Sequence, residues 1–355
     1  MKQLTCILST LILLYINLQQ IFFAQAQTNS KKSQDNITGS STVLNYAILN
    51  KTLKFSKERA HYKSPFDFPE EYKEMVTLYI DKKYKKAIEK LEQWEKSKAV
   101  DVYFFALLGN SYDLNNQPEK AVETYKRGIE RYETSLLYSH LAIALMGQKK
   151  YNEALAAFEE AIDITYLGKH NYYYWASKLL CSSNDPISGL IYGEISIVTD
   201  PGSEHNYELS KLMYDTYKRI ITFNEKIPSV TIPNHDTQKT DTTSFNAIYI
   251  KVLTMSVAGE TSFTLSSLNT IRKNFVTNYY NMGYDRTNPY PLFKHQQAVL
   301  QAGHNNAYNY WLFGAGDEAF TSAWVSQYKD NFKQFTDWAE KNEIQLNASP
   351  KLLHN

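Results

Sequence analysis

The sequence predicts an all-α protein in which a stack of helical hairpins is followed by helices that do not continue the stack. The first observation is a small residue that returns at nearly constant spacing, since Ala87, Ala121, Ala154 and Gly189 are separated by 34, 33 and 35 positions. The second is a seven-position pattern that moves by 33 residues between the two middle copies. The third is that residues 245–355 keep helical apolar spacing but lose this period. A period of this length indicates a solenoid of two-helix units.

The first 26 residues have the pattern of an export signal. Lys2 precedes an apolar stretch from Leu4 to Ile16, and Ala24-Gln25-Ala26 forms an A-x-A cleavage site. We expect cleavage after Ala26 and delivery to the periplasm, the cell surface or the medium, with no membrane insertion after cleavage. A retained anchor is the weaker alternative, because polar residues interrupt the apolar run. Residues 27–69 are rich in Ser, Thr, Asn and Lys and predict a polar leader.

Residues 70–225 carry the predicted solenoid. The matching positions of its central copies are Phe105 and Tyr138, Leu108 and Leu141, Gly109 and Ala142, Tyr112 and Leu145, Ala121 and Ala154, Tyr125 and Phe158, and Gly128 and Ala161. The small positions allow two helices to approach closely while the aromatic positions fill the space between units. Because a single unit cannot bury its apolar stripe, weaker copies should flank the central pair, giving three to four repeats. Apolar residues at helical spacing over residues 207–221 predict a capping helix.

This order of aromatic, leucine and small residues resembles the tetratricopeptide repeat family over roughly residues 70–202. The resemblance implies a concave groove, lined by the first helix of each repeat, that binds a protein or peptide partner. The groove positions that it implies are Tyr72, Val76 and Tyr79, then Tyr103, Ala106, Asn110 and Asp113, then Ser139, Ile143 and Met146, and finally Tyr174, Lys178 and Cys181.

The family's carboxylate clamp, which grips a peptide C-terminus, requires paired Lys and Asn residues along this groove. Only Asn110 and Lys178 are present, in different copies, so we do not expect recognition of a peptide C-terminus. The abundance of tyrosine favours an extended or helical segment held by aromatic packing. The alternative is that several of these tyrosines pack on the leader or on the C-terminal domain.

Pro228, Pro233 and the polar run from His235 to Ser244 predict a linker over residues 226–244. Residues 245–355 then form a predicted, mainly helical C-terminal domain. Its first stretch, 245–258, fits either a strand or a buried helix, whereas Asp317 is typical of a helix N-cap. The run QAVLQAGHNNAYNYWLFG resembles the tail of secreted tetratricopeptide repeat proteins of Bacteroidetes, whose C-terminal domain is uncharacterised.

Composition limits the classes of partner. Removal of the first 26 residues takes away only Lys2, so 38 basic groups become 37 against 37 acidic groups. This balance gives no electrostatic argument for binding nucleic acid or a membrane surface. The Lys-rich stretch from Lys82 to Lys90 is best explained as a solvated helix face.

Candidate chemical groups are few. His295, His304, Asp317 and Glu318 are the closest grouping of imidazoles and carboxylates in residues 245–355, but no recognised metal-ligand, phosphate-loop or nucleophile motif is present. Cys181 is interpreted as a packed or groove-side thiol rather than a nucleophile. We therefore expect no metal, no cofactor and no enzymatic activity.

The sequence favours an exported, non-catalytic scaffold that binds a polypeptide. One alternative is a cell-envelope enzyme with a catalytic C-terminal domain, which would require the two histidines and a carboxylate to converge. Another is a glycan-binding module that uses exposed aromatic side chains. The partner and the oligomeric state are left open.

Overall fold

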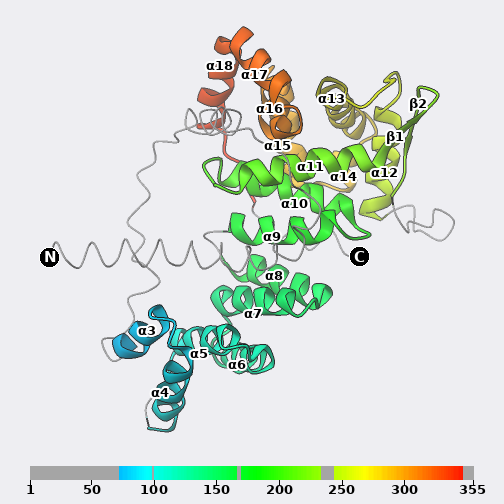
Figure 1. Cartoon of the computed structure of the whole chain (residues 1–355). Coiled ribbons are helices and arrows are strands. Elements are labelled where there is room, and N and C mark those ends of the chain that lie inside the picture. The colour runs from blue at the N-terminus through cyan, green and yellow to red at the C-terminus, as the bar shows by residue number, and fades with distance from the viewer. Residues whose placement is uncertain (1–71, 98–99, 166–168, 233–243, 347–355) are drawn as a thin grey trace. The chain divides into compact units, whose positions relative to one another are not determined.

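The computed structural model describes residues 72–97, 100–165, 169–232 and 244–346 (Figure 1). The predicted export signal (1–26) and polar leader (27–69) lie outside the described residues. Within the described ranges, no helix is both long enough and apolar enough to cross a membrane.

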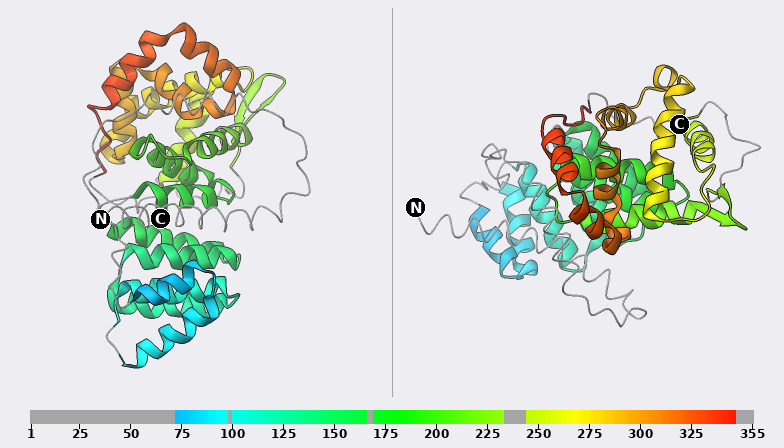
Figure 2. Two further views of the ribbon diagram at one scale, coloured as in Figure 1. Left: turned by 60° about the vertical axis from the view of Figure 1, so that its left-hand side comes forward. Right: turned by 90° about the horizontal axis from the view of Figure 1, so that it is seen from above.

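Four consecutive helical hairpins form the repeat region. They are α3 (Lys73–Ile80) with α4 (Tyr84–Ser97), α5 (Val102–Leu114) with α6 (Pro118–Tyr132), α7 (Ser135–Gly147) with α8 (Tyr151–Ile164), and α9 (Lys169–Cys181) with α10 (Pro186–Thr199). Each hairpin packs on the next, and α10 packs on a further helix, α11 (Asn206–Ile220) (Figure 2). The predicted all-α solenoid is confirmed, with four repeats and a helix at the predicted capping position.

The periodic small residues lie where helices approach most closely. Ala87, Ala121 and Ala154 have no exposed surface. A Cβ atom on Gly189 would lie 2.5 Å from the backbone nitrogen of Cys181, so only glycine fits there. The 33-to-35-residue period is therefore the period of these helix contacts.

The turn inside each of the first three hairpins repeats the same backbone conformation. Lys82, Asn116 and Lys149 all have positive φ, at 59°, 59° and 61°. This left-handed conformation is uncommon for residues with a Cβ, although asparagine adopts it more readily. Its recurrence at equivalent positions shows that the turn is part of the repeated unit.

A short β-hairpin follows α11 and corrects part of the linker prediction. Strands β1 (Ile221–Asn224) and β2 (Ile227–Val230) pair antiparallel, with Ile221 opposite Val230. Glu225 and Lys226 between them have φ values of 46° and 68°, as a tight two-residue hairpin turn requires. The prediction of linker was wrong for 227–230 because Pro228 was interpreted as a break, whereas a proline is tolerated in an edge strand. Residues 233–243 lie outside the described residues.

The C-terminal region is helical from its start. Its elements are α12 (Phe245–Ser256), α13 (Leu265–Asn281), α14 (Tyr284–Thr287), α15 (Pro291–Gln301), α16 (Asn305–Phe313), the 3₁₀ turn η3 (Gly314–Gly316), α17 (Glu318–Gln327) and α18 (Lys329–Ala339). The ambiguous stretch forms α12, and Ser244 caps it by accepting a hydrogen bond from the Ala247 N–H at 3.3 Å. Asp317 caps α17 as predicted, accepting from the Phe320 N–H at 3.1 Å.

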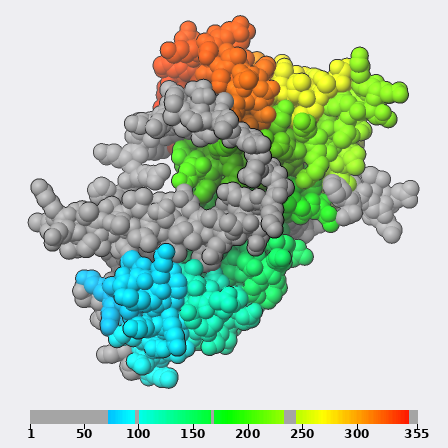
Figure 3. All heavy atoms as spheres, in the orientation of Figure 1, coloured from blue at the N-terminus to red at the C-terminus, as the bar shows by residue number. Residues whose placement is uncertain are grey.

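The hydrophobic core continues across the predicted linker. Buried apolar side chains form one cluster that extends from Tyr72 in the first repeat to Phe335 in α18. Helix α11 contacts α10 and also α16 and η3. In Figure 3, yellow and orange atoms of the C-terminal helices lie against green atoms of the preceding region. A Cβ on Gly316 would lie 2.1 Å from the Tyr214 ring, which shows how closely η3 packs on α11. The C-terminal helices are thus continuous with the repeats.

Candidate functional site

The predicted binding residues lie on α3, α5, α7 and α9, except Tyr72, which directly precedes α3. We call the side of these helices that carries them the first-helix face. The structure places some of them at partly accessible positions and buries others. The half-buried members are Val76, Tyr79, Tyr103, Asn110, Asp113, Ile143, Met146 and Lys178. The buried members are Tyr72, Ala106, Ser139, Tyr174 and Cys181. Accessible surface is therefore concentrated on the first three repeats.

Helix α11 accounts for the loss of surface at the fourth repeat. The Tyr174 hydroxyl donates to Glu208 Oε2 at 2.7 Å, and Lys178 Nζ donates to Glu208 Oε1 at 2.6 Å. The His205 imidazole stacks on the Tyr174 ring with centroids 4.3 Å apart. Only 2% of Tyr174 is exposed, so the expectation that it faces a partner does not fit this structure. Both residues are engaged by the capping helix.

Tyr72 is also buried, in this case at the start of α3. Its ring lies 5.4 Å from that of Trp94, and only 3% of the residue is exposed. Burial raises the pKa of its hydroxyl to about 12. Tyr72 therefore anchors the first hairpin and offers little surface to a partner.

In the second repeat, Asn110 has an intramolecular role that the sequence did not indicate. Its Oδ1 accepts a hydrogen bond from the Tyr125 hydroxyl at 2.6 Å. The His140 imidazole of α7 stacks on the Tyr125 ring, with ring centroids 5.7 Å apart and an interplanar angle of 12°. Burial lowers the pKa of His140 to about 4, so this imidazole is neutral at physiological pH.

Asp113, near the end of α5, differs from its neighbours on the first-helix face. Among the described residues, its carboxylate has no hydrogen-bond or ion-pair partner. Burial raises its pKa to about 6, because a carboxylate away from water is harder to ionise. Neither α5, which carries Asp113, nor α7, the first helix of the next repeat, contains Lys or Arg. Neither helix therefore supplies a positive charge to balance the Asp113 carboxylate.

A buried polar network joins α10 to the C-terminal helices. Glu194 Oε1 accepts hydrogen bonds from Arg272 Nη2 at 2.6 Å, Gln296 Nε2 at 2.7 Å and the Tyr308 hydroxyl at 2.6 Å. Arg272 also donates to Asn309 Oδ1 at 2.6 Å. The side chains of Glu194 and Arg272 are 3% and 8% exposed. Because an isolated buried charge is very unfavourable, this pairing fixes how α13, α15 and α16 dock on the last repeat.

Three asparagines of α16 extend the contact with α13. Asn269 Oδ1 accepts from Asn305 Nδ2 at 2.9 Å and Asn309 Nδ2 at 3.0 Å, and its own Nδ2 donates to Asn306 Oδ1 at 2.9 Å. The asparagines of the run QAVLQAGHNNAYNYWLFG thus serve helix docking. The sequence signal that could have revealed the network is a glutamate inside the otherwise uncharged α10.

The four groups singled out in the C-terminal region divide into two sets of contacts. The ring centroids of His295 and His304 lie 6.0 and 5.6 Å from that of Trp338. Burial lowers the pKa of both imidazoles. Asp317 caps α17, while Glu318 accepts a hydrogen bond from the Tyr207 hydroxyl. Within the described ranges, no group of three or more His, Cys, Asp or Glu residues is placed to hold a metal ion.

Cys181 is buried at the end of α9. Its Sγ lies 3.8 Å from Ser177 Oγ, and burial raises the pKa of the thiol to about 11. A neutral, buried thiol is a poor nucleophile, which supports a packing role.

Comparison with known proteins identifies one of the hairpins. Residues 134–165 match the family model described as "Tetratricopeptide repeat". This segment contains α7 and α8. Neither the curated proteins nor the solved structures provide a match to this chain.

Proposed function

We propose that this chain is an exported, non-catalytic scaffold, because residues 134–165 match the tetratricopeptide repeat, a unit that generally mediates protein–protein contacts. It binds an extended or helical polypeptide segment along the first-helix face of α5 and α7. The observation that carries this proposal is the accessible surface on these two helices, which combines apolar side chains with one unpartnered carboxylate.

The composition of the first-helix face supports a polypeptide ligand. Ile143 and Met146 of α7 and Tyr103 of α5 are half-buried, so each can bury further surface when a ligand packs against it. Aromatic and aliphatic side chains of this kind dominate the energetics of peptide binding. The balanced charge of the chain favours a polypeptide over nucleic acid as the partner.

The C-terminal helices brace the end of the stack in this proposal. Helix α11 covers part of α9, and the Glu194–Arg272 pair attaches α13 to α10. A solenoid needs its terminal unit covered by atypical elements, because the exposed end would otherwise present apolar surface. The C-terminal region therefore serves stability and adds contacts beside the repeats.

Export is part of the proposal and has its own test. The pattern of residues 1–26 predicts that the mature chain begins at Gln27. N-terminal sequencing of the protein recovered from the native host should give Gln27 as the first residue. Recovery of an uncleaved chain from the cytoplasm would contradict export.

Site-specific photo-crosslinking tests the binding face. We would replace Ile143 with p-benzoylphenylalanine in the full chain, and place the same group at Tyr151 as a control. Tyr151 lies on α8, a second helix, and is 52% exposed. One defined polypeptide should crosslink at Ile143 and not at Tyr151, and the purified polypeptide should then bind in solution. The same adducts at both positions, or none at Ile143, would contradict the proposal.

A further inference from the structure

We propose that Asp113 anchors a cationic side chain, Lys or Arg, of the polypeptide that lies on the first-helix face. This inference rests on the proposed function and adds the chemistry of the partner. It follows from the charge distribution on α5 and α7, the surroundings of Asp113 and its lack of a partner.

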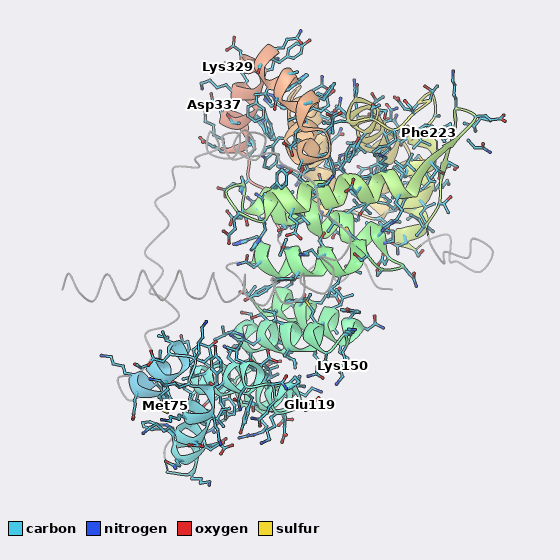
Figure 4. All side chains as sticks on the ribbon, viewed as in Figure 1. Met75, Glu119, Lys150, Phe223, Lys329 and Asp337 are labelled. Atoms are coloured by element: carbon cyan, nitrogen blue, oxygen red, sulfur yellow. The ribbon has the colours of Figure 1, made fainter. Side chains whose placement is uncertain are left out.

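Asp113 is the only acidic residue in α5, and neither α5 nor α7 contains Lys or Arg. The one imidazole on these helices, His140, is buried and neutral, and it packs on Tyr125. Lys149 and Lys150 follow the end of α7 and are exposed, and Lys150 is labelled in Figure 4. Neither forms an ion pair with Asp113 in the described structure. The central part of the first-helix face therefore carries one uncompensated negative charge.

The neighbours of α5 on this face are largely apolar. Helix α3 packs against one side of α5 and carries Val76 and Tyr79, while α7 packs against the other and carries Ile143 and Met146. All four side chains are partly buried against the core. Apolar neighbours restrict water, which strengthens any ion pair formed there. A peptide that covers these side chains would exclude more water from Asp113.

Covering Asp113 with a neutral ligand would leave a desolvated carboxylate without a partner, which is unfavourable. A Lys or Arg side chain removes this penalty, because it supplies both a positive charge and hydrogen-bond donors. A metal ion is a poorer occupant, since the described residues provide no group of three ligands. The geometry thus selects a peptide with a basic residue between apolar ones.

The experiment uses decapeptide pools with blocked ends, in which one position is fixed as Arg, norleucine or Glu. Binding of each pool is measured to the mature chain, to Asp113→Asn and to Glu123→Gln. Glu123 is an exposed carboxylate on α6, so its variant matches the charge change away from the first-helix face. The mature chain and Glu123→Gln should prefer Arg over norleucine by about tenfold at one or two positions, as expected for a charge-assisted hydrogen bond. Asp113→Asn should lose this preference.

A charge-reversal variant provides a second readout. Asp113→Lys should prefer Glu pools at the positions where the mature chain prefers Arg, and circular dichroism should show that both variants are folded. An unchanged Arg preference in Asp113→Asn, or none in the mature chain, overturns the inference while peptide binding itself stands. Failure of every pool to bind the mature chain contradicts the proposed function and the inference with it.

Discussion

The buried pair of Glu194 and Arg272 gives the strongest prediction about stability. The Nη2 to Oε1 distance is 2.6 Å, and both side chains are almost fully buried. Glu194→Gln keeps the shape but leaves the Arg272 charge uncompensated, and Arg272→Met does the same to Glu194. Removal of one partner of a buried pair costs about 3–5 kcal/mol. We expect each single variant to lower the free energy of unfolding by this amount.

The double variant Glu194→Gln/Arg272→Met separates the pair from its surroundings. With neither charge present, its loss of stability should fall short of the sum of the single losses by about 2 kcal/mol or more. The assay is urea unfolding, followed by circular dichroism and by tryptophan fluorescence. Since the core is continuous, the two probes should report one transition. Additivity within about 0.5 kcal/mol, or single losses below about 1 kcal/mol, would show that the two buried charges do not stabilise each other.

Three further predictions concern single positions. Gly109→Ala should destabilise the chain by about 1–3 kcal/mol in urea unfolding, because its Cβ would lie 2.3 Å from the Tyr125 ring; an unchanged midpoint would contradict the close packing. As pH rises from about 4 to above 6, the free energy of unfolding of Asp113→Asn should increase by about 1–3 kcal/mol relative to that of wild type. The reason is that the pKa of Asp113 is raised in the native state, so ionisation of this carboxylate lowers the stability of the wild-type protein over that window. Parallel profiles of stability against pH for the two proteins would contradict this. In a Cys6→Ser chain, Cys181 should not react with iodoacetamide at pH 8 until urea unfolds the protein, and rapid native labelling would contradict its burial.

The repeats could be predicted because their determinants are local and periodic. Ala121 and Ala154 occupy positions where two helices touch, and a larger side chain has no room there. The constraint recurs in each unit, so it leaves a visible period in the sequence. The capping helix followed from apolar spacing alone, and the N-cap at Asp317 followed from residue chemistry.

The docking of the C-terminal helices could not be predicted in the same way. Glu194 accepts hydrogen bonds from Gln296 and Tyr308, which are 102 and 114 residues away in the sequence. No local sequence pattern predicts contacts over such separations. The β-hairpin was missed because Pro228 usually marks a break and is tolerated here at an edge.

The candidate site was predicted in part. The spacing placed Val76, Asn110 and Ile143 on first helices, but it did not reveal which side chains other elements would cover. Tyr174 is buried because it is engaged by Glu208 of α11 and by His205, the residue just before α11. Asn110 holds the Tyr125 hydroxyl, so an alanine there would disturb packing as well as binding. Whether a side chain on these helices is buried depends on the elements that pack over it, and the repeat pattern does not specify those elements.

Binding along the first-helix face is tested by the affinity of the crosslinked polypeptide, measured by isothermal titration calorimetry. The mature chain is compared with Ile143→Ala/Met146→Ala on the first-helix face and with Tyr151→Ala on α8, after circular dichroism has shown that all three are folded. The double variant should bind at least about tenfold more weakly, and Tyr151→Ala should bind like wild type. Unchanged affinity in the double variant would contradict the claim that this face binds the partner.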